Sequence, residues 1–446
     1  MERSALDAPQ AEDAPLQPQH DVPINSEDED ERIASKKRLL EAETLRSSSP
    51  LENLPAELRH KLLMSMPDLP SLKAIVHASP LMHAQYLYSR GTILRSCLGR
   101  ELGGLFVDAF ATLKSRVSIL GSPRTNGMIE GFLDSYNGWL FGLTRLSVAT
   151  TGSSSVRKWA LENLYTGTSH LLGEEKKKDV SLELQRSEEI RIFRAIYRCE
   201  TFHHLFGNNR GRRRGAFRFN EVNEFFLCLF NPWEVEEIGC IDLFVRDNYE
   251  GLFNQVKADL SPSNTRFLQP NGILNPDGSV DISMECDDYI ECIVSRGLRM
   301  LAHLFTIDDH DKLVVGMGRC ITHDRCFDGS LQKALSNMAQ GDRREMSPRF
   351  PNPQDEAQER GDPMEFTGDT TSAEGPPVAW VLLWNGRYAN IYGNYVPIQL
   401  RKWGYVMWNE YRWKDMEAKE LIRKQWEESP MEVELIEMDF NWSPLY

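Results

Sequence analysis

Apolar residues recur at helical spacing close to the N-terminal end of the chain. Leu58, Leu62 and Met66 follow one another at intervals of four residues, between Pro55 and Pro67. Proline has no backbone N–H and a preset φ, so it suits the first turn of a helix and stops a helix from continuing. The pattern therefore predicts one short helix bounded by the two prolines.

Two more helices are predicted directly after it. Ser71 follows a proline and precedes an apolar group, as at the start of a helix. Ser79 is placed as the N-cap, and Pro80 as the first-turn proline, of a third helix. This third helix is expected to run, with a bend at Gly91, to the glycine pair at 103–104.

These three helices carry more apolar side chains than a bundle of this size needs inside. Helices this short are marginal in water by themselves, so they must pack on one another or on a partner. An exposed apolar patch on such a unit commonly marks a protein interface. The apolar side chains are Leu54, Leu58, Leu62, Leu63, Met66, Leu69, Leu72, Ile75 and Val76.

Residues 105–340 are predicted to form a helical body. Ile190, Phe193 and Tyr197 share one face of a helix, for which Ser187 is the predicted N-cap. This apolar stripe is expected to belong to the core.

A second helix of the body is predicted to begin at Pro232. Asn231 can cap it, and the Glu234 carboxylate is placed to reach back to the cap. Glu236 and Glu237 lie on the same helix without an identifiable partner for acid–base chemistry, so we interpret them as structural.

Two segments are predicted to be disordered. Residues 1–50 are rich in proline, serine and acid, and residues 341–377 are rich in proline, glycine and charge. Such compositions bury too little apolar surface to offset the entropy of ordering the chain. The second segment is therefore interpreted as an insertion or linker.

Residues 378–446 are predicted to form a small module that combines a hairpin with a helix. Asn385-Gly386 favours the positive backbone angles of a tight hairpin turn between two apolar runs. A helix is expected from Ala418 until Pro430 stops it. Most of the seven tryptophans in this module are expected in its core: Trp380, Trp384, Trp403, Trp408, Trp413, Trp426 and Trp442.

Together these elements predict a mainly α fold. It comprises a three-helix N-terminal unit over residues 51–104, the helical middle body, and a small α+β, aromatic-rich C-terminal module that packs on the body.

The composition favours protein partners. The chain has 446 residues, of which 41% are hydrophobic, and its net charge of −15 and pI of 5.3 argue against general attraction to nucleic acid or membrane. Eight cysteines without the regular spacing of a disulfide scaffold indicate reduced thiols, in the cytoplasm or nucleus. No apolar run is long enough to span a bilayer.

The N-terminal stretch contains an ordered series of blocks: Leu54-Pro55-x-Glu57-Leu58, Leu62-Leu63, Met66-Pro67-Asp68-Leu69-Pro70-Ser71-Leu72, Ala78-Ser79-Pro80 and Tyr86. With these blocks it resembles the F-box, in the form that is abundant in filamentous fungi. This resemblance implies a domain that binds the small Skp-type adaptor of a cullin-RING ubiquitin ligase. The residues implied to contact that adaptor are Leu54, Pro55, Leu58, Leu62, Leu63, Met66, Leu69, Leu72 and Ile75.

By this resemblance, the chain is a non-catalytic, substrate-recruiting adaptor of an SCF-type ligase and needs no cofactor. The rest of the chain would select a protein substrate. The alternative is a helical scaffold or regulatory protein with no ligase role, which uses the same apolar face within the molecule.

A third hypothesis is an enzyme or metalloprotein. Cys320, His323 and Cys326 lie at steps of three residues, with His303 and His310 upstream, and these side chains suit zinc. Because a recognised pair-and-pair spacing is missing, ordinary buried thiols and a satisfied histidine are favoured.

One strong basic cluster, Arg210–Arg214, is followed by Phe217 and Phe219. Arginine beside aromatic rings can bind phosphates and stack bases. In an acidic protein, a charged loop or a docking site for an acidic protein segment is favoured instead. The pair Gly316 and Gly318 lacks the third glycine and the lysine of a phosphate-binding loop.

Overall fold

In the computed structural model, the described residues are 50–121, 124–143, 184–207, 217–260, 290–291, 293–320, 331–336, 356–357, 360–370, 373, 375–414 and 417–445. The chain divides into two compact units, Met1–Cys97 (unit 1) and Leu98–Tyr446 (unit 2). The predicted disordered head lies outside the described residues except for Pro50. Helices built from the described residues are all too short or too polar to cross a membrane.

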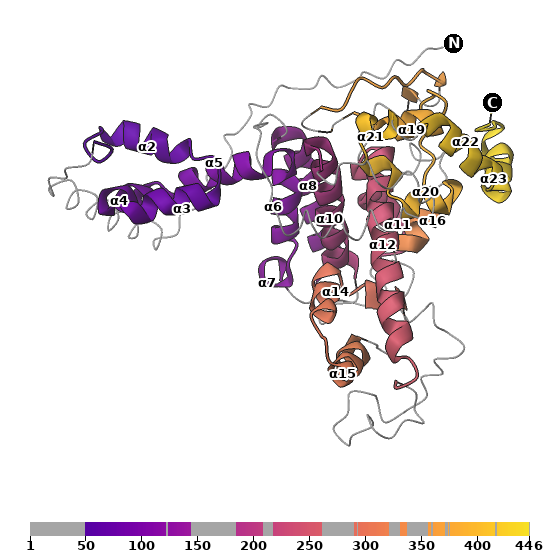
Figure 1. Cartoon of the computed structure of the whole chain (residues 1–446), viewed down its shortest axis with the longest axis horizontal. Coiled ribbons are helices and arrows are strands. Elements are labelled where there is room, and N and C mark those ends of the chain that lie inside the picture. Colours follow the sequence, from indigo (N-terminus) through magenta and orange to yellow (C-terminus); the bar gives the residue numbers. More distant parts are fainter. Residues whose placement is uncertain are drawn as a thin grey trace, which may run out of the picture. The chain divides into compact units, whose positions relative to one another are not determined.

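Unit 1 contains α2 (Ala56–Met64), α3 (Leu69–Ala78), α4 (Pro80–Tyr88) and the start of α5 (Arg90–Leu102) (Figure 1). The Asp68 carboxylate accepts a hydrogen bond from the Ser71 N–H at 2.7 Å, which caps α3 and lowers the pKa of Asp68. The Ser79 hydroxyl accepts one from the Met82 N–H at 3.2 Å and caps α4, as predicted.

The predicted third helix is in fact two helices. At the end of α4, Ser89 leaves the helical region with φ −123° and ψ 26°, and its N–H bonds to the Gln85 and Tyr86 carbonyls. The expected bend at Gly91 is wrong, because Gly91 lies inside the first turn of α5. Non-glycine residues tolerate the backbone angles of Ser89, so the change of direction needs no glycine.

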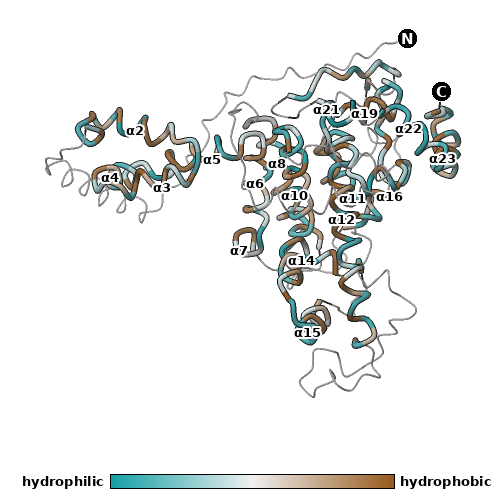
Figure 2. The backbone as a smooth tube through the Cα atoms, viewed as in Figure 1, coloured by the Kyte–Doolittle hydropathy of each residue, from teal (hydrophilic) through white to brown (hydrophobic). Residues whose placement is uncertain are grey.

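Unit 1 has a hydrophobic core of its own. Its buried residues are Leu63, Leu72, Val76, Met82, Ile93 and Cys97. They come from all four helices, and packing of this kind is what allows such short helices to persist in water. Hydrophobic and hydrophilic positions share the same helices in this unit, as expected for helices with one buried face (Figure 2).

Unit 2 is also helical, and its described residues include an isolated β-bridge between Pro363 and Arg387. Its α-helices are α6 (Phe106–Lys114), α7 (Val117–Leu120), α8 (Asn126–Leu143), α10 (Arg186–Phe206), α11 (Phe219–Phe225), α12 (Pro232–Val256), α14 (Leu298–Phe305), α15 (His310–Cys320), α16 (Leu331–Ser336), α19 (Val378–Leu383), α20 (Ile398–Lys402), α21 (Glu410–Lys414), α22 (Ala418–Glu427) and α23 (Pro430–Phe440). Short 3₁₀ turns are η1 (Gly103–Leu105), η5 (Leu227–Leu229), η7 (Gly393–Tyr395) and η8 (Tyr405–Met407).

The long helices α10 and α12 pack side by side in the middle of unit 2 (Figure 1). The predicted start of α12 is confirmed, because the Asn231 N–H donates to the Glu234 carboxylate at 3.0 Å and Pro232 occupies the first position. The predicted cap of α10 is wrong. That helix begins at Arg186, so Gln185 and not Ser187 is its N-cap. The Gln185 N–H donates a hydrogen bond to the Glu188 carboxylate at 2.9 Å.

One hydrophobic core joins the middle body to the C-terminal module. It extends along the sequence from Val107 to Ile436. The expectation that the C-terminal tryptophans are mostly core is confirmed, and Trp442 is the one that is only partly buried. The fully buried ones are Trp380, Trp384, Trp403, Trp408, Trp413 and Trp426.

The predicted hairpin after residue 378 is wrong, because the first run is the helix α19. Asn385 and Gly386 do take positive φ values, of 50° and 71°. They close the helix instead of a hairpin: the Gly386 N–H bonds to the Val381 carbonyl at 2.9 Å and the Asn385 N–H to the Leu382 carbonyl at 3.2 Å. This is the Schellman arrangement that ends many helices, and it needs the same backbone angles as a tight turn.

The prediction of a disordered linker is wrong for the later, described part of residues 341–377. Met364 and Ala373 are buried. Asp369 forms an ion pair with Arg191 at 2.5 Å and accepts a hydrogen bond from the Glu410 N–H at 2.6 Å. A few apolar and acidic side chains thus fix a segment whose average composition is polar.

Buried arginines on α10 connect the parts of unit 2. Arg191, Arg194 and Arg198 follow the helix at steps of three and four residues, so they share one face. Each guanidinium is almost wholly buried and bonded to acidic groups. We call these three residues the arginine row.

The acidic partners of the arginine row come from different segments. Arg194 binds the α12 residue Glu237 with two hydrogen bonds, at 2.6 and 2.9 Å. Arg198 binds Asp108 of α6 at 2.8 Å, and the Tyr136 hydroxyl donates to the same carboxylate. Burial alone would lower the pKa of Arg198, but its acidic neighbours raise it, so the charge persists.

We predict that Arg194→Ala lowers the free energy of unfolding of unit 2 by about 3–5 kcal/mol, because it leaves the Glu237 carboxyl group buried without the partner that holds it. Urea denaturation followed by tryptophan fluorescence measures this, since all ten tryptophans lie beyond Cys97. The control is Arg423→Ala, whose ion pairs with Glu420 and Glu427 are exposed and screened by solvent, so its loss should be much smaller. Equal losses in the two variants would contradict the assigned role.

Candidate protein-binding surface

The loop that precedes α2 is fixed by a buried arginine. Arg59 donates from its guanidinium to the Leu54 carbonyl at 2.6 Å and to the Glu52 carbonyl at 3.2 Å. The Glu52 carboxylate in turn accepts a hydrogen bond from the Ser79 hydroxyl at the start of α4. Backbone and side-chain bonds therefore hold the loop against the helices that follow it.

Large apolar side chains remain exposed beside this fixed loop. Leu51 is 50% exposed and Leu58, in the first turns of α2, is 46% exposed. Pro55 is exposed at the helix start, and Leu54 is half-buried. We call these four residues the loop surface. Rigid apolar groups of this kind lose little conformational entropy when a partner covers them.

The structure divides the predicted adaptor-contacting residues into three groups. Pro55 and Leu58 are exposed, whereas Leu63 and Leu72 are buried in the core of unit 1. For Leu63 and Leu72, the prediction of an exposed contact is wrong, because both side chains lie in the core of unit 1, where α2 and α3 each pack against α4. The half-buried ones are Leu54, Leu62, Met66, Leu69 and Ile75.

Sequence reasoning missed the residues that hold the loop. Arg59 lies directly after Leu58, and nothing in its spacing marks it as buried. The bond between Glu52 and Ser79 joins residues 27 positions apart. Only the role of Ser79 as an N-cap could be read locally, and the hydroxyl serves both functions.

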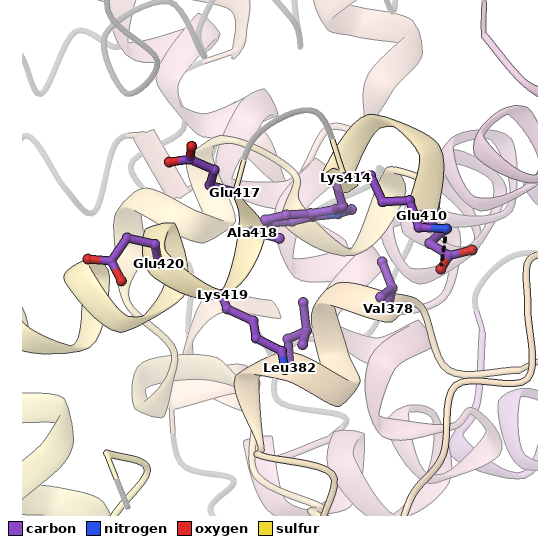
Figure 3. A pocket seen from close by; sticks show the side chains of 9 residues that line it. Val378, Leu382, Glu410, Lys414, Glu417, Ala418, Lys419 and Glu420 are labelled. Atoms are coloured by element: carbon purple, nitrogen blue, oxygen red, sulfur yellow. Dashed lines mark ion pairs between the residues drawn. The ribbon is translucent and has the colours of Figure 1, made fainter.

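Among the described residues of unit 2, a pocket and an apolar stripe are candidate contacts for another protein. The first is a shallow pocket of about 480 Å³ between α19, α21 and α22 (Figure 3). Its lining combines apolar and charged side chains, with a Lys414–Glu410 ion pair at 2.9 Å on the rim. The lining residues are Val378, Leu382, Glu410, Trp413, Lys414, Glu417, Ala418, Lys419 and Glu420.

The second feature is an exposed apolar stripe on α23. Met431, Leu435 and Met438 recur at helical spacing and are exposed, the two methionines by 72% and 73%. Val433 and Ile436 occupy the opposite, buried face of the same helix. The stripe is therefore surplus to the packing of α23 on unit 2.

The metal site predicted from sequence is only partly described. His323 and Cys326 lie outside the described residues. Cys320 is buried, its thiol donates to the Gly316 carbonyl at 3.4 Å, and burial raises its pKa. His310 lies at the other end of the same helix, about 15 Å away by helical rise, and contacts Asp259 at 2.8 Å instead.

The predicted basic and aromatic cluster is also only partly described. Arg210–Arg214 lies outside the described residues. Phe217 is buried and packs edge-to-face on Phe206 at a centroid distance of 5.4 Å, so it does not stack on an external base. Glu236 and Glu237, considered for acid–base chemistry, bind the buried arginines Arg401 and Arg194.

Five cysteines fall within the described residues, and no disulfide joins them. All five are buried. They are Cys97, Cys199, Cys228, Cys240 and Cys320.

No family model, curated protein or solved structure matches this chain.

We predict that Arg59→Ala loosens the loop surface and the first turn of α2. The Leu58 and Arg59 N–H groups both bond to the Pro55 carbonyl at 3.0 Å, and fraying would break these bonds. Losing a buried charged donor costs about 1–3 kcal/mol, so hydrogen exchange at these amides should accelerate at least about fivefold. Lys61→Ala, at an exposed position of the same helix, should leave the rates unchanged. Unchanged exchange in Arg59→Ala would show that Arg59 does not hold the loop.

Proposed function

We propose that this chain is a substrate-recruiting adaptor of an SCF-type cullin-RING ubiquitin ligase, in which unit 1 binds the Skp-type adaptor. The observation that carries the proposal is the loop surface: Leu51 and Leu58 stay exposed on a unit that already has its own core. The F-box-like order of sequence blocks in the same residues supports the same partner.

The proposed contact is smaller than the sequence suggested. It consists of Leu51, Leu54, Pro55 and Leu58, with the half-buried Leu62 at its edge. Because Arg59 and Glu52 hold the loop before binding, association would order few additional residues. Leu63 and Leu72 would act indirectly, by keeping α2 and α3 in place.

The proposed mechanism is proximity. A ligase adaptor raises the effective concentration of a protein target near the ubiquitin carrier, so it needs rigid spacing and selective contacts. The arginine row and the continuous core of unit 2 would supply that rigidity. The pocket beside Leu382 and the stripe on α23 are the surfaces through which we propose that a target is recruited.

A helical scaffold or regulatory protein with no ligase role remains the alternative function. The burial of Leu63 and Leu72 inside unit 1 favours it, because these side chains need no partner to cover them. The exposure of Leu58 favours the ligase adaptor.

We predict that Leu58→Glu weakens binding of the purified full chain to a fungal Skp-type adaptor by at least about tenfold. A charge at the centre of an apolar contact costs about 1.4 kcal/mol or more, which equals a tenfold change in Kd. The double variant Leu54→Ala/Pro55→Ala should abolish detectable binding. Biolayer interferometry measures both, and circular dichroism checks that the helices remain.

The matched control is Leu113→Glu on α6, whose leucine is 45% exposed and lies in unit 2. It should bind the Skp-type adaptor like the unaltered chain. Unchanged affinity in Leu58→Glu, or an equal loss in both variants, would count against the proposal and favour the scaffold.

A further inference from the structure

A cysteine, a histidine and an aspartate meet in the core between α10 and α12. Cys199 and His203 lie four residues apart on α10, so they share one face of that helix. Asp242 lies on the neighbouring α12. One donor atom from each residue lies within 4.8 Å of the other two, and all three residues are buried.

Asp242 has a buried carboxylate without a bonded partner among the described residues. The residue is only 4% exposed, and no hydrogen bond or ion pair from the described part of the chain reaches it. The nearby cations Arg401 and Arg246 are paired with Glu236 at 3.2 Å and with Glu291 at 3.4 Å. Burying a carboxylate without a bonded partner is costly, and a cation bound beside it would offset that cost.

We propose that Cys199, His203 and Asp242 form a binding site for a divalent transition metal, with zinc(II) as the ion that best fits the ligands. Thiolate, imidazole and carboxylate are all zinc ligands, and three protein ligands leave a fourth position for water. Magnesium and calcium prefer sites made of oxygen atoms alone.

The spacing of the side chains suits this ion. The Cys199 sulfur lies 3.8 Å from the His203 Nδ1. Two such atoms bound to one zinc ion in tetrahedral geometry lie about 3.5 Å apart, given bond lengths of about 2.3 and 2.0 Å. Small rotations of the side chains would therefore complete the coordination.

Charge also balances in this site. A divalent ion together with one thiolate and one carboxylate carries no net charge, which a low-dielectric core tolerates best. Metal binding would release the thiol proton of Cys199 to solvent, and the neutral imidazole of His203 would offer a ring nitrogen to the ion.

A metal ion here would connect α10 to α12, the two helices at the centre of unit 2 (Figure 1). The site would add stability to the same helix pair that the arginine row joins. It is independent of the loop surface, because its residues all belong to unit 2.

The test is metal analysis of the purified full chain. After chelator treatment and incubation with Zn²⁺ alone, followed by removal of free ion, we expect about one zinc per chain by mass spectrometry. Cys199→Ala and Asp242→Asn should each lose this zinc. Replacement with Co²⁺ should give the visible absorption of a tetrahedral ion and a thiolate charge-transfer band, which Cys199→Ala should lack.

The control is Cys320→Ala, another buried thiol in unit 2, which should keep the zinc. Circular dichroism and the thermal midpoint of each apo protein show whether a variant still folds. The unaltered chain provides a test that needs no variant, since Zn²⁺ should raise its thermal midpoint. Absence of bound zinc in the unaltered chain, or loss of zinc only in Cys320→Ala, would overturn the proposal.

Discussion

The structure of unit 2 depends on buried arginines, each of which needs an ion pair with a carboxylate inside the protein. Arg191, Arg194 and Arg198 lie on one face of α10, and their partners come from α6, α12 and the segment around Asp369. Removing one partner from such a pair leaves a buried charge, which costs far more than an exposed ion pair provides. Few alternative packings are therefore possible, because each segment must place a carboxylate beside an arginine of the arginine row. The α10 residue Glu188 extends the same principle by binding Arg412 at 2.6 Å, which joins α10 to the C-terminal module.

Unit 1 uses one buried arginine in a different way. Arg59 bonds to backbone carbonyls and so shapes a loop, where the arginine row joins helices. Its core is small, and its shape leaves Leu51 and Leu58 to solvent. In the proposed function, unit 1 binds the ligase through a loop that is already ordered, and unit 2 is a rigid body that binds a target. In both units the rigidity comes from buried arginines that are bonded within the chain.

Much of the helical fold could be predicted from the sequence, because capping residues act locally. Asn231, Pro232 and Glu234 start α12 as expected, and Ser79 caps α4. The predictions were wrong where the same short sequence suits two different structures, or where a side chain binds a residue that is distant in the sequence. Asn385-Gly386 has the backbone angles of both a hairpin turn and a helix end, and the burial of Trp380, Leu383 and Trp384 decided for the helix. The candidate surface was predicted as a set of leucines, but spacing alone could not separate the buried Leu63 from the exposed Leu58. Neither could it show that Arg59 would turn inward.

The central claim is that the apolar loop surface of unit 1 binds a Skp-type adaptor, and calorimetric titration of that purified adaptor into the full chain tests it most directly. The account predicts saturable binding of one adaptor per chain, with a negative heat-capacity change because apolar surface is buried. Titrations at several temperatures that show no saturable binding would contradict it.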